Sequence, residues 1–212
     1  MKDKEKHETP PGPLTSDGVS RRSFLKGTGM AAMGIAASLP EAKAEESAVV
    51  GPGAVSLSLS INGTDTAVHI APNTTLADTL RNHLGLTGTK ISCHRGACSA
   101  CTVWLDGKAV CSCMTLAIDV GTRKVTTIEG LADGEALHPV QQAFIDKDAS
   151  MCGFCTPGMI MSCAALLECN AAPSLDDVRT AVSGNLCRCG TYPKVFEATL
   201  AAAAARGASS YE

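Results

Sequence analysis

The sequence lacks the motifs with which a chain of this length usually carries out catalysis by itself. It contains no Walker-type phosphate loop and no Gly-x-Gly-x-x-Gly dinucleotide fingerprint. No Ser, His and Asp residues are grouped in the pattern of a hydrolytic triad. No internal repeat with a period of about 20 to 50 residues is present. We therefore do not expect substrate chemistry on this chain alone.

The chain also lacks an excess of basic residues and a long hydrophobic run. Lys and Arg number 18 against 21 Asp and Glu, a net charge of -3. This balance argues against nucleic acid or an anionic membrane surface as the partner. One uncharged run extends from Gly27 to Leu39, but it falls short of the roughly 20 apolar residues that a membrane-spanning helix needs.

That uncharged run lies within a segment that has the features of an export signal. It follows Ser20-Arg21-Arg22-Ser23-Phe24-Leu25-Lys26 and precedes a small-x-small cleavage site at 42–44. We expect residues 1–44 to be a twin-arginine signal peptide, which directs a folded protein to the periplasm. The remaining chain would carry 11 basic and 16 acidic residues, a net charge of -5.

Eight of the eleven cysteines form two separate four-cysteine frameworks. The frameworks are Cys93-x4-Cys98-x2-Cys101-x11-Cys113 and Cys152-x2-Cys155-x31-Cys187-x-Cys189. The first three positions of the first framework have the spacing of plant-type [2Fe-2S] ferredoxins. Two such frameworks in one short chain predict a pair of iron–sulfur clusters, an arrangement that moves single electrons.

Disulfides and zinc are the competing interpretations. An exported cysteine-rich chain usually carries disulfides, but a twin-arginine substrate can bind iron in the cytoplasm before export. Cys187 and Cys189 are also poor disulfide partners, because residues two apart in an extended chain are separated by about 6.6 to 6.8 Å. Structural zinc sites usually use two close cysteine pairs, unlike the first framework. The second framework, taken alone, also suits zinc.

Several other residues are weaker candidates. Cys111 is a spare ligand candidate beside Cys113. His94 follows the first ligand, but no C-x2-H partner for a Rieske-type site is present. Cys163 lies in an apolar helical segment and is expected to be a small buried hydrophobe. Trp104, in the strand that follows the cysteine loop, is expected to belong to the core.

The hydrophobic pattern predicts an α+β fold with two domains. Apolar residues alternate over 55–61, Asn62-Gly63 is typical of a hairpin turn, and a second strand follows through Val68 and Ile70. A helix is expected over 75–84, ended by Gly85. Further strands at 102–105 and 108–110 complete a β-grasp, plant-type ferredoxin-like domain.

Beyond Leu131 the strand signals stop and helical signals begin. Helices are expected from Pro139, from near Pro157 to Glu168, after an N-cap at Ser174, and from about Pro193. They predict a small four-helix-bundle [2Fe-2S] domain. The predicted divisions are a signal peptide 1–44, a linker 45–54, a ferredoxin-like domain 55–130, a helical domain 131–206 and a tail 207–212.

Four motifs together resemble a known family. They are CSACTV at 98–103, TIEGL at 127–131, CGFCTPGM at 152–159 and GNLCRCGTY at 184–192. In this order they resemble the small iron–sulfur subunit of the molybdenum hydroxylases, the xanthine dehydrogenase and aldehyde oxidoreductase family, and especially periplasmic aldehyde or isoquinoline oxidoreductases. The resemblance covers about residues 55 to 200.

The resemblance implies an electron-transfer subunit. The cluster of the helical domain would lie next to the molybdopterin cofactor of a large catalytic subunit, which oxidises an aldehyde or an N-heterocycle. The ferredoxin-like cluster would pass electrons to a flavin subunit or a cytochrome-type acceptor. The proximal ligands would be Cys152, Cys155, Cys187 and Cys189, with Cys189 nearest the pterin, and the distal ligands Cys93, Cys98, Cys101 and Cys113. A free-standing ferredoxin-like carrier is the alternative, and a zinc-stabilised binding module is a third hypothesis.

Three positions depart from the family pattern. Ser99 and Ser92 stand where the family commonly has glycine, and both are small enough that we expect an intact cluster. Met151 stands where the family commonly has a glutamine that hydrogen-bonds the pterin, and a thioether is only a weak acceptor. Arg188, between two ligands, is expected either to offset thiolate charge or to meet a partner.

Overall fold

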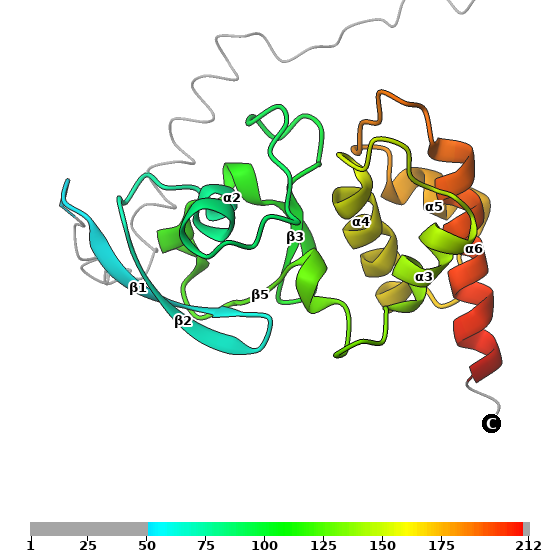
Figure 1. Cartoon of the computed structure of the whole chain (residues 1–212), viewed down its shortest axis with the longest axis horizontal. Coiled ribbons are helices and arrows are strands. Elements are labelled where there is room, and N and C mark those ends of the chain that lie inside the picture. The colour runs from blue at the N-terminus through cyan, green and yellow to red at the C-terminus, as the bar shows by residue number, and fades with distance from the viewer. Residues whose placement is uncertain (1–50, 210–212) are drawn as a thin grey trace, which may run out of the picture. The chain divides into compact units, whose positions relative to one another are not determined.

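The computed structural model describes residues 51–209, and a mixed five-stranded sheet forms the first half of this described part (Figure 1). The strands are β1 (Val55–Ile61), β2 (Thr64–Ile70), β3 (Thr102–Leu105), β4 (Lys108–Cys111) and β5 (Lys124–Thr126), in the order β2-β1-β5-β3-β4. Strands β1 and β5 are parallel, and the other neighbouring pairs are antiparallel. The predicted signal peptide lies outside the described residues.

The predicted hairpin between β1 and β2 is confirmed. Asn62 and Gly63 have φ values of 51° and 80°, and a two-residue turn with two positive φ angles matches the right-handed twist of the strands. The Asn62 side chain also reaches across the sheet: its Oδ1 accepts from the Thr127 amide at 2.9 Å, and its Nδ2 donates to Thr127 Oγ1 at 3.0 Å. The turn therefore holds the segment that leads out of β5.

The helix expected over 75–84 is present in a wider form. It begins as α2 (Leu76–Asp78), capped by Thr75, and continues as the π-helix η1 (Thr79–His83) before Gly85 at φ 71°. The carbonyl of Leu80 accepts from the Leu86 amide across the Gly85 turn, while the Leu84 amide bonds Thr79. The last turn is therefore a π turn instead of an α turn.

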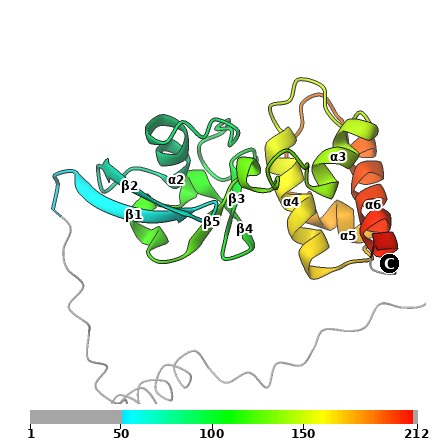
Figure 2. The same cartoon turned by 60° about the horizontal axis from the view of Figure 1, so that its bottom comes forward.

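Helices make up the second half of the described chain (Figures 1 and 2). They are α3 (Pro139–Asp146), α4 (Thr156–Cys169), α5 (Leu175–Ala181) and α6 (Tyr192–Ser209). Ser174 caps α5 as predicted, with Asp177 completing a capping box. Helix α6 continues to Ser209, three residues beyond the predicted domain end at 206. Short 3-10 turns lie at η2 (Ser112–Met114), η3 (Ala117–Val120) and η4 (Ile128–Gly130). No helix within residues 51–209 is both long and apolar enough to span a bilayer.

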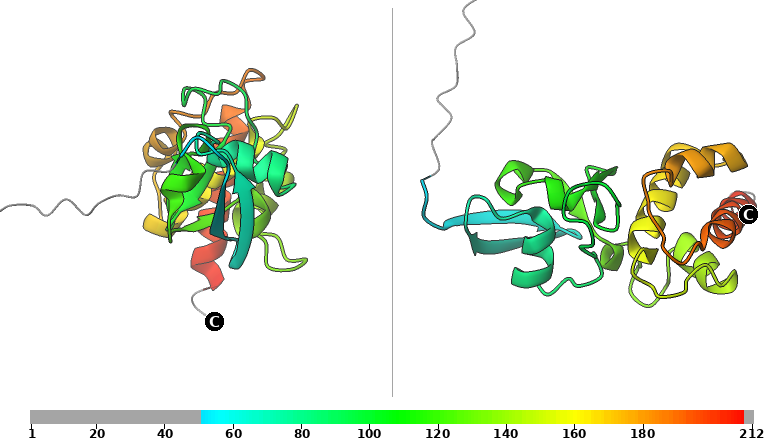
Figure 3. Two further views of the ribbon diagram at one scale, coloured as in Figure 1. Left: turned by 90° about the vertical axis from the view of Figure 1, so that its left-hand side faces the viewer. Right: turned by 90° about the horizontal axis from the view of Figure 1, so that it is seen from above.

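Strand β3 lies between two hydrophobic cores. Val103 and Leu105 belong to the core of the sheet half, together with buried residues of β1, β2 and α2. Trp104 points to the opposite face, as the two-residue period of a strand requires, and belongs to the core of the helical half with residues of α3, α4 and α6. All four residues of β3 are buried. The helical half therefore covers the second face of this strand, and Figure 3 shows α4 beside the sheet.

Candidate metal centres

The loop that carries the first cysteine framework runs from η1 to β3 and is held at its start by charged side chains. Arg81 Nη1 donates to the carbonyl oxygens of Thr87 and Thr89 at 2.7 and 2.6 Å. The Gly88 amide donates to Glu129 Oε1 at 2.7 Å. A Cβ atom on Gly88 would lie 2.4 Å from Cγ2 of Ile128 and 2.7 Å from the same oxygen, so a larger residue would require both side chains to move.

The loop itself supplies the geometry expected around thiolates. Gly96 has φ 71°, and a Cβ atom there would lie 2.9 Å from Cγ of Met114. The Ala97 amide donates to Cys93 Sγ at 3.3 Å. Backbone N–H groups that point at sulfur stabilise the negative charge of a thiolate and of a cluster.

The four predicted sulfurs of the first framework lie in two pairs. Cys93 interacts with Cys98, and Cys101 interacts with Cys113. The backbone amide of Arg95 and the Cys98 thiol lower the pKa of Cys93 to about 7. Burial, and then the Cys113 thiol, raise the pKa of Cys101 to about 12. Two pairs of thiols suit a two-iron core held by four cysteines.

The two weaker candidates near this loop have other partners. Cys111 Sγ lies 3.8 Å from the Gly96 carbonyl oxygen and 3.6 Å from Ser99 Oγ. Cys113, which is buried, hydrogen-bonds the Cys101 thiol, whereas Cys111 acts on the pKa of Cys101 through its charge alone. His94 Nε2 lies 3.5 Å from Asp78 Oδ2. The geometry favours Cys113 over Cys111 as the fourth ligand.

The second framework joins the start of α4 to the loop between α5 and α6. Its sulfurs also form two pairs, Cys155 with Cys187 and Cys152 with Cys189. Burial and the Cys187 thiol raise the pKa of Cys155 to about 12. At Cys187 burial raises the pKa, but hydrogen bonds from Thr191 outweigh it and bring the value down to about 7. Among the described residues, no three Cys, His, Asp or Glu side chains converge on a single metal ion. The sulfurs are arranged in pairs.

Tyr192 holds the loop that carries Cys187 and Cys189. Its hydroxyl accepts from the Cys187 amide at 2.9 Å and donates to the Asn185 carbonyl oxygen at 2.9 Å. Thr191 Oγ1 lies 3.3 Å from Cys187 Sγ. The role of Tyr192 was not predicted from the sequence, although the tyrosine belongs to the 184–192 motif.

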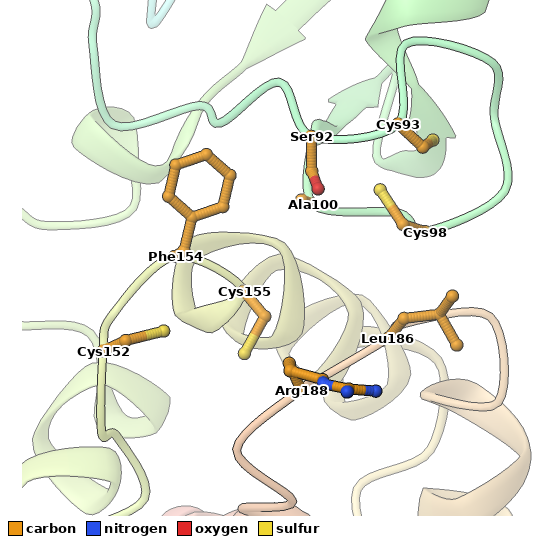
Figure 4. A pocket seen from close by; sticks show the side chains of 9 residues that line it. All are labelled: Ser92, Cys93, Cys98, Ala100, Cys152, Phe154, Cys155, Leu186 and Arg188. Atoms are coloured by element: carbon orange, nitrogen blue, oxygen red, sulfur yellow. The ribbon is translucent and has the colours of Figure 1, made fainter.

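A cavity of ≈ 300 Å³ lies between the two frameworks. Figure 4 shows Cys93 and Cys98 on one side of it and Cys152 and Cys155 on the other. The remaining lining residues are Ser92, Ala100, Phe154, Leu186 and Arg188. Two cysteines of each framework thus border one space. A sulfur donor set of this kind fits iron–sulfur clusters on both sides.

Direct hydrogen bonds join the two frameworks at the edge of this cavity. The Leu186 amide donates to the Cys98 carbonyl oxygen at 3.1 Å. Asn185 Nδ2 donates to the Ser99 carbonyl oxygen at 3.2 Å. A Cβ atom on Gly158 would lie 2.3 Å from that same oxygen, so α4 can approach the loop only because residue 158 is glycine. Ser99 itself has φ 52°, which explains why glycine suits its position.

Comparisons with known proteins agree with this architecture. Residues 59–125 match the 2Fe-2S iron-sulfur cluster binding domain family, and residues 127–200 match the [2Fe-2S] binding domain family. The chain is 47% identical over 146 residues to the nicotine 6-hydroxylase small subunit of Paenarthrobacter nicotinovorans, covering 69% of this chain and 88% of that protein. The chain belongs to the small iron–sulfur subunits of the molybdenum hydroxylases.

Other relatives of this iron–sulfur protein support the assignment. It is 46% identical to one of the subunits of the nicotinate dehydrogenase from Pseudomonas putida, over 71% of this chain and 96% of the relative. Quinoline 2-oxidoreductase from Pseudomonas putida 86 is a solved structure with a TM-score of 0.69 and 43% identity, covering 72% of this chain and 95% of that one. The aldehyde oxidoreductase of Desulfovibrio gigas has a TM-score of 0.69 and 40% identity, covering 73% of this chain and 17% of its much longer chain.

The family assignment settles the broad role of the chain. It is the iron–sulfur component of a molybdenum oxidoreductase complex and performs no substrate chemistry itself. The α+β class and the two iron–sulfur domain types are confirmed.

Proposed function

We propose that this chain carries single electrons from a molybdopterin site on a large partner subunit, through two [2Fe-2S] clusters, to a flavin or another external acceptor. One cluster would be held by the ferredoxin-like domain and the other by a small four-helix bundle. The observation that carries the proposal is the placement of both cysteine frameworks around one cavity, with the Leu186 amide bonded to the Cys98 carbonyl oxygen. A carrier with one cluster would not need a contact between two cysteine frameworks.

The ligands would be the two sets of four cysteines. Cys93, Cys98, Cys101 and Cys113 would hold the distal cluster, and Cys152, Cys155, Cys187 and Cys189 the proximal one. When bound, each cluster supplies a one-electron redox centre. The protein's own part is to hold the thiolates, to direct N–H groups at sulfur and to keep the two centres at a set separation. Cys101 and Cys155, whose pKa values are raised to about 12, would lose their protons as iron binds.

The exposed surface supports the helical domain as the side that faces the molybdopterin. Cys152 and Cys189 are both exposed. Three large apolar side chains near the second framework are exposed as well: Met151 by 72%, Phe154 by 46% and Leu186 by 57%. Exposed apolar groups around two ligand cysteines suit a protein partner that covers them. The relatives are named for nicotine, nicotinate, quinoline and aldehydes, which supports an aldehyde or an N-heterocycle as the substrate of the complex.

Metal content and magnetic resonance test the proposal. The purified complex should contain about four irons per copy of this chain, two per cluster. Dithionite reduction should produce two distinguishable electron paramagnetic resonance signals. Cys98→Ala should remove one signal and Cys155→Ala the other. Zinc in place of iron, or a single signal at full iron occupancy, would contradict it. A protein that carries both clusters but never purifies with a molybdenum-containing subunit would be a free-standing carrier.

We also infer that the chain works in the periplasm after export by the twin-arginine route. The support is the Arg21-Arg22 motif and the cleavage site at 42–44, which lie outside the described residues. Replacing both arginines with lysine should leave a folded, iron-containing protein in the cytoplasm. Export of the double-lysine variant at the wild-type level would argue against this route.

A further inference from the structure

We propose that Trp104 is a positioning residue that sets the separation and orientation of the two cluster-binding domains. This inference rests on the two-cluster relay proposed above. It concerns the junction between the domains and involves neither the cluster ligands nor the partner subunit. Trp104 is the only tryptophan in the chain.

The backbone of Trp104 lies in the ferredoxin-like domain, but its indole packs in the core of the helical domain. Its backbone lies in β3, paired with Ala109 of β4 and Thr126 of β5. Its side chain is packed in the helical core and is only 9% exposed. The indole Nε1–H donates to the Met161 carbonyl oxygen of α4 at 2.9 Å, in a buried setting. A buried donor of this kind is directional, and it orients α4 against β3 as well as holding it there.

Trp104 is close in sequence to the first cysteine framework, and Met161, whose carbonyl oxygen accepts its hydrogen bond, is close in sequence to the second. Trp104 lies three residues after Cys101, on the strand into which the cysteine loop runs. Met161 lies six residues after Cys155, on the helix that this cysteine precedes. A regular strand and a regular helix are stiff over such short distances, so a shift at one residue moves the others with it. The bond between Trp104 and Met161 therefore connects two rigid elements, each of which begins beside a set of predicted ligands.

The covalent connection between the domains is less constraining. Between η4 and α3 the chain passes through Asp133–Leu137, all of them exposed. Within the described residues, the hydrogen bonds across the junction are the Trp104 bond, the bonds from Asn185 to Ser99 and from Leu186 to Cys98, and the bond from Gln141 of α3 to Ile128 of η4. The Asn185 and Leu186 bonds involve loops and the Gln141 bond involves the short turn next to the covalent connection, so in this part of the chain only the Trp104 bond joins a strand to a helix. We therefore assign to Trp104 the role of holding the docked arrangement.

The test separates the hydrogen bond of the indole from its volume. A site-specific benzothienylalanine at position 104 keeps the bicyclic shape but replaces the N–H with sulfur, and Trp104→Leu removes the ring as well. Phe144→Leu is the matched control, because Phe144 is a buried ring of the same core on α3. Each variant is studied in the assembled complex.

Two readouts report on the position of the domains. The first is the magnetic interaction between the two reduced clusters, which depends on their separation and orientation. The second is hydrogen exchange of the Leu186 amide, whose bond to Cys98 crosses the junction and opens when the domains separate. Loss of one neutral hydrogen bond should shift the docking equilibrium, and hence Leu186 exchange, by up to about tenfold.

We expect unchanged iron content in every variant. Benzothienylalanine at position 104 should give faster exchange of the Leu186 amide and an altered magnetic interaction between the clusters. Trp104→Leu should change both the exchange and the magnetic interaction further. Phe144→Leu should lower the melting temperature without changing the magnetic interaction. Wild-type exchange and wild-type interaction in both Trp104 variants would overturn the inference. If the wild-type protein lacked two clusters, the proposed function would fail, and Leu186 exchange would still decide whether Trp104 positions the domains.

Discussion

The backbone amide of Leu186 donates a hydrogen bond to the carbonyl oxygen of Cys98, at 3.1 Å. Cys98 is a predicted ligand in the ferredoxin-like domain, and Leu186 immediately precedes Cys187, a predicted ligand in the helical domain. One hydrogen bond and a few covalent bonds therefore connect a ligand of each framework. The two domains are therefore in contact beside their predicted cluster ligands, where electrons would pass from one cluster to the other.

Removing this amide should weaken the junction. Leu186→Pro deletes the N–H donor, whereas Leu186→Ala keeps it and trims a side chain that is 57% exposed. We expect the proline variant to lose about 1 kcal/mol of unfolding free energy relative to the alanine variant and to transfer electrons between the clusters more slowly. Denaturant titration and reduction kinetics of the two signals measure these effects. Equal behaviour of the two variants would mean that the bond has no role in the relay.

Gly158→Ala should separate the domains even though alanine favours helices. The added Cβ would lie 2.3 Å from the Ser99 carbonyl oxygen, which is backbone and cannot rotate away. Overpacking of this kind costs about 1 to 3 kcal/mol, more than the roughly 1 kcal/mol that alanine contributes over glycine in a helix. Gly184→Ala is the control, because its Cβ would lie 3.4 Å from the Ser99 hydroxyl. If both variants unfold at the wild-type denaturant concentration, the close approach does not limit the packing of α4.

His138 should make stability depend on pH. Its Nδ1 accepts from the Val140 amide and caps α3, which only a neutral imidazole can do. Burial, and then the Arg206 charge, lower the pKa of His138 below 6.5, against the opposing effect of Glu168. As the pH falls below 6.5, the unfolded chain takes up a proton before the folded chain does, so this contribution to stability is present above that pH and is lost below it.

The measurement for His138 is the free energy of unfolding at pH 7.5 and pH 5, in the wild type and in His138→Asn. Asparagine caps helices well and does not titrate. The wild type should lose more stability than the variant over this interval. Equal losses of unfolding free energy in the two proteins would show that the pH dependence comes from a group other than His138.

Met151→Gln should change the binding of the molybdenum cofactor or of the partner subunit, and it should leave the iron content unchanged. Met151 is 72% exposed, and the motif resemblance places it where the family commonly has a glutamine that bonds the pterin. One added neutral hydrogen bond contributes about 0.5 to 1.5 kcal/mol, which corresponds to a change in partner or cofactor affinity of up to about tenfold. Iron content, molybdenum retention and turnover of the complex should be compared with those of the wild type. Loss of iron would show that Met151 supports the cluster instead.

Much of the local structure could be predicted because it depends on neighbouring residues. The hairpin at Asn62-Gly63, the turn at Gly85 and the Ser174 cap all follow from intrinsic backbone preferences, and each is present. The π turn of η1 could not be predicted in this way. It depends on the Thr79 carbonyl accepting from the Leu84 amide, five residues on, instead of from the amide four residues on, a choice between two nearby donors that the spacing of the leucines does not encode.

Other features of the site depended on contacts between distant segments. Trp104 was expected in the core and is buried, but it lies in the core of the helical domain. Ser99 was expected to fit in place of glycine because it is small. The structure shows that the relevant property is its left-handed φ of 52°, a conformation in which a side chain of any size costs energy.

By itself, the sequence determined the two cysteine frameworks, the order of the helices and of four of the five strands, and the family to which the chain belongs, but it did not indicate β5. These properties rest on spacing, periodicity and turn chemistry, which act within short stretches of chain. Only the tertiary structure decided which sulfurs are neighbours, that Cys113 hydrogen-bonds the Cys101 thiol whereas Cys111 does not, and that Gly158, Trp104 and Leu186 form the junction. Packing brings these groups together from distant parts of the chain, and no local pattern records that a glycine in one helix makes room for a carbonyl oxygen in another domain.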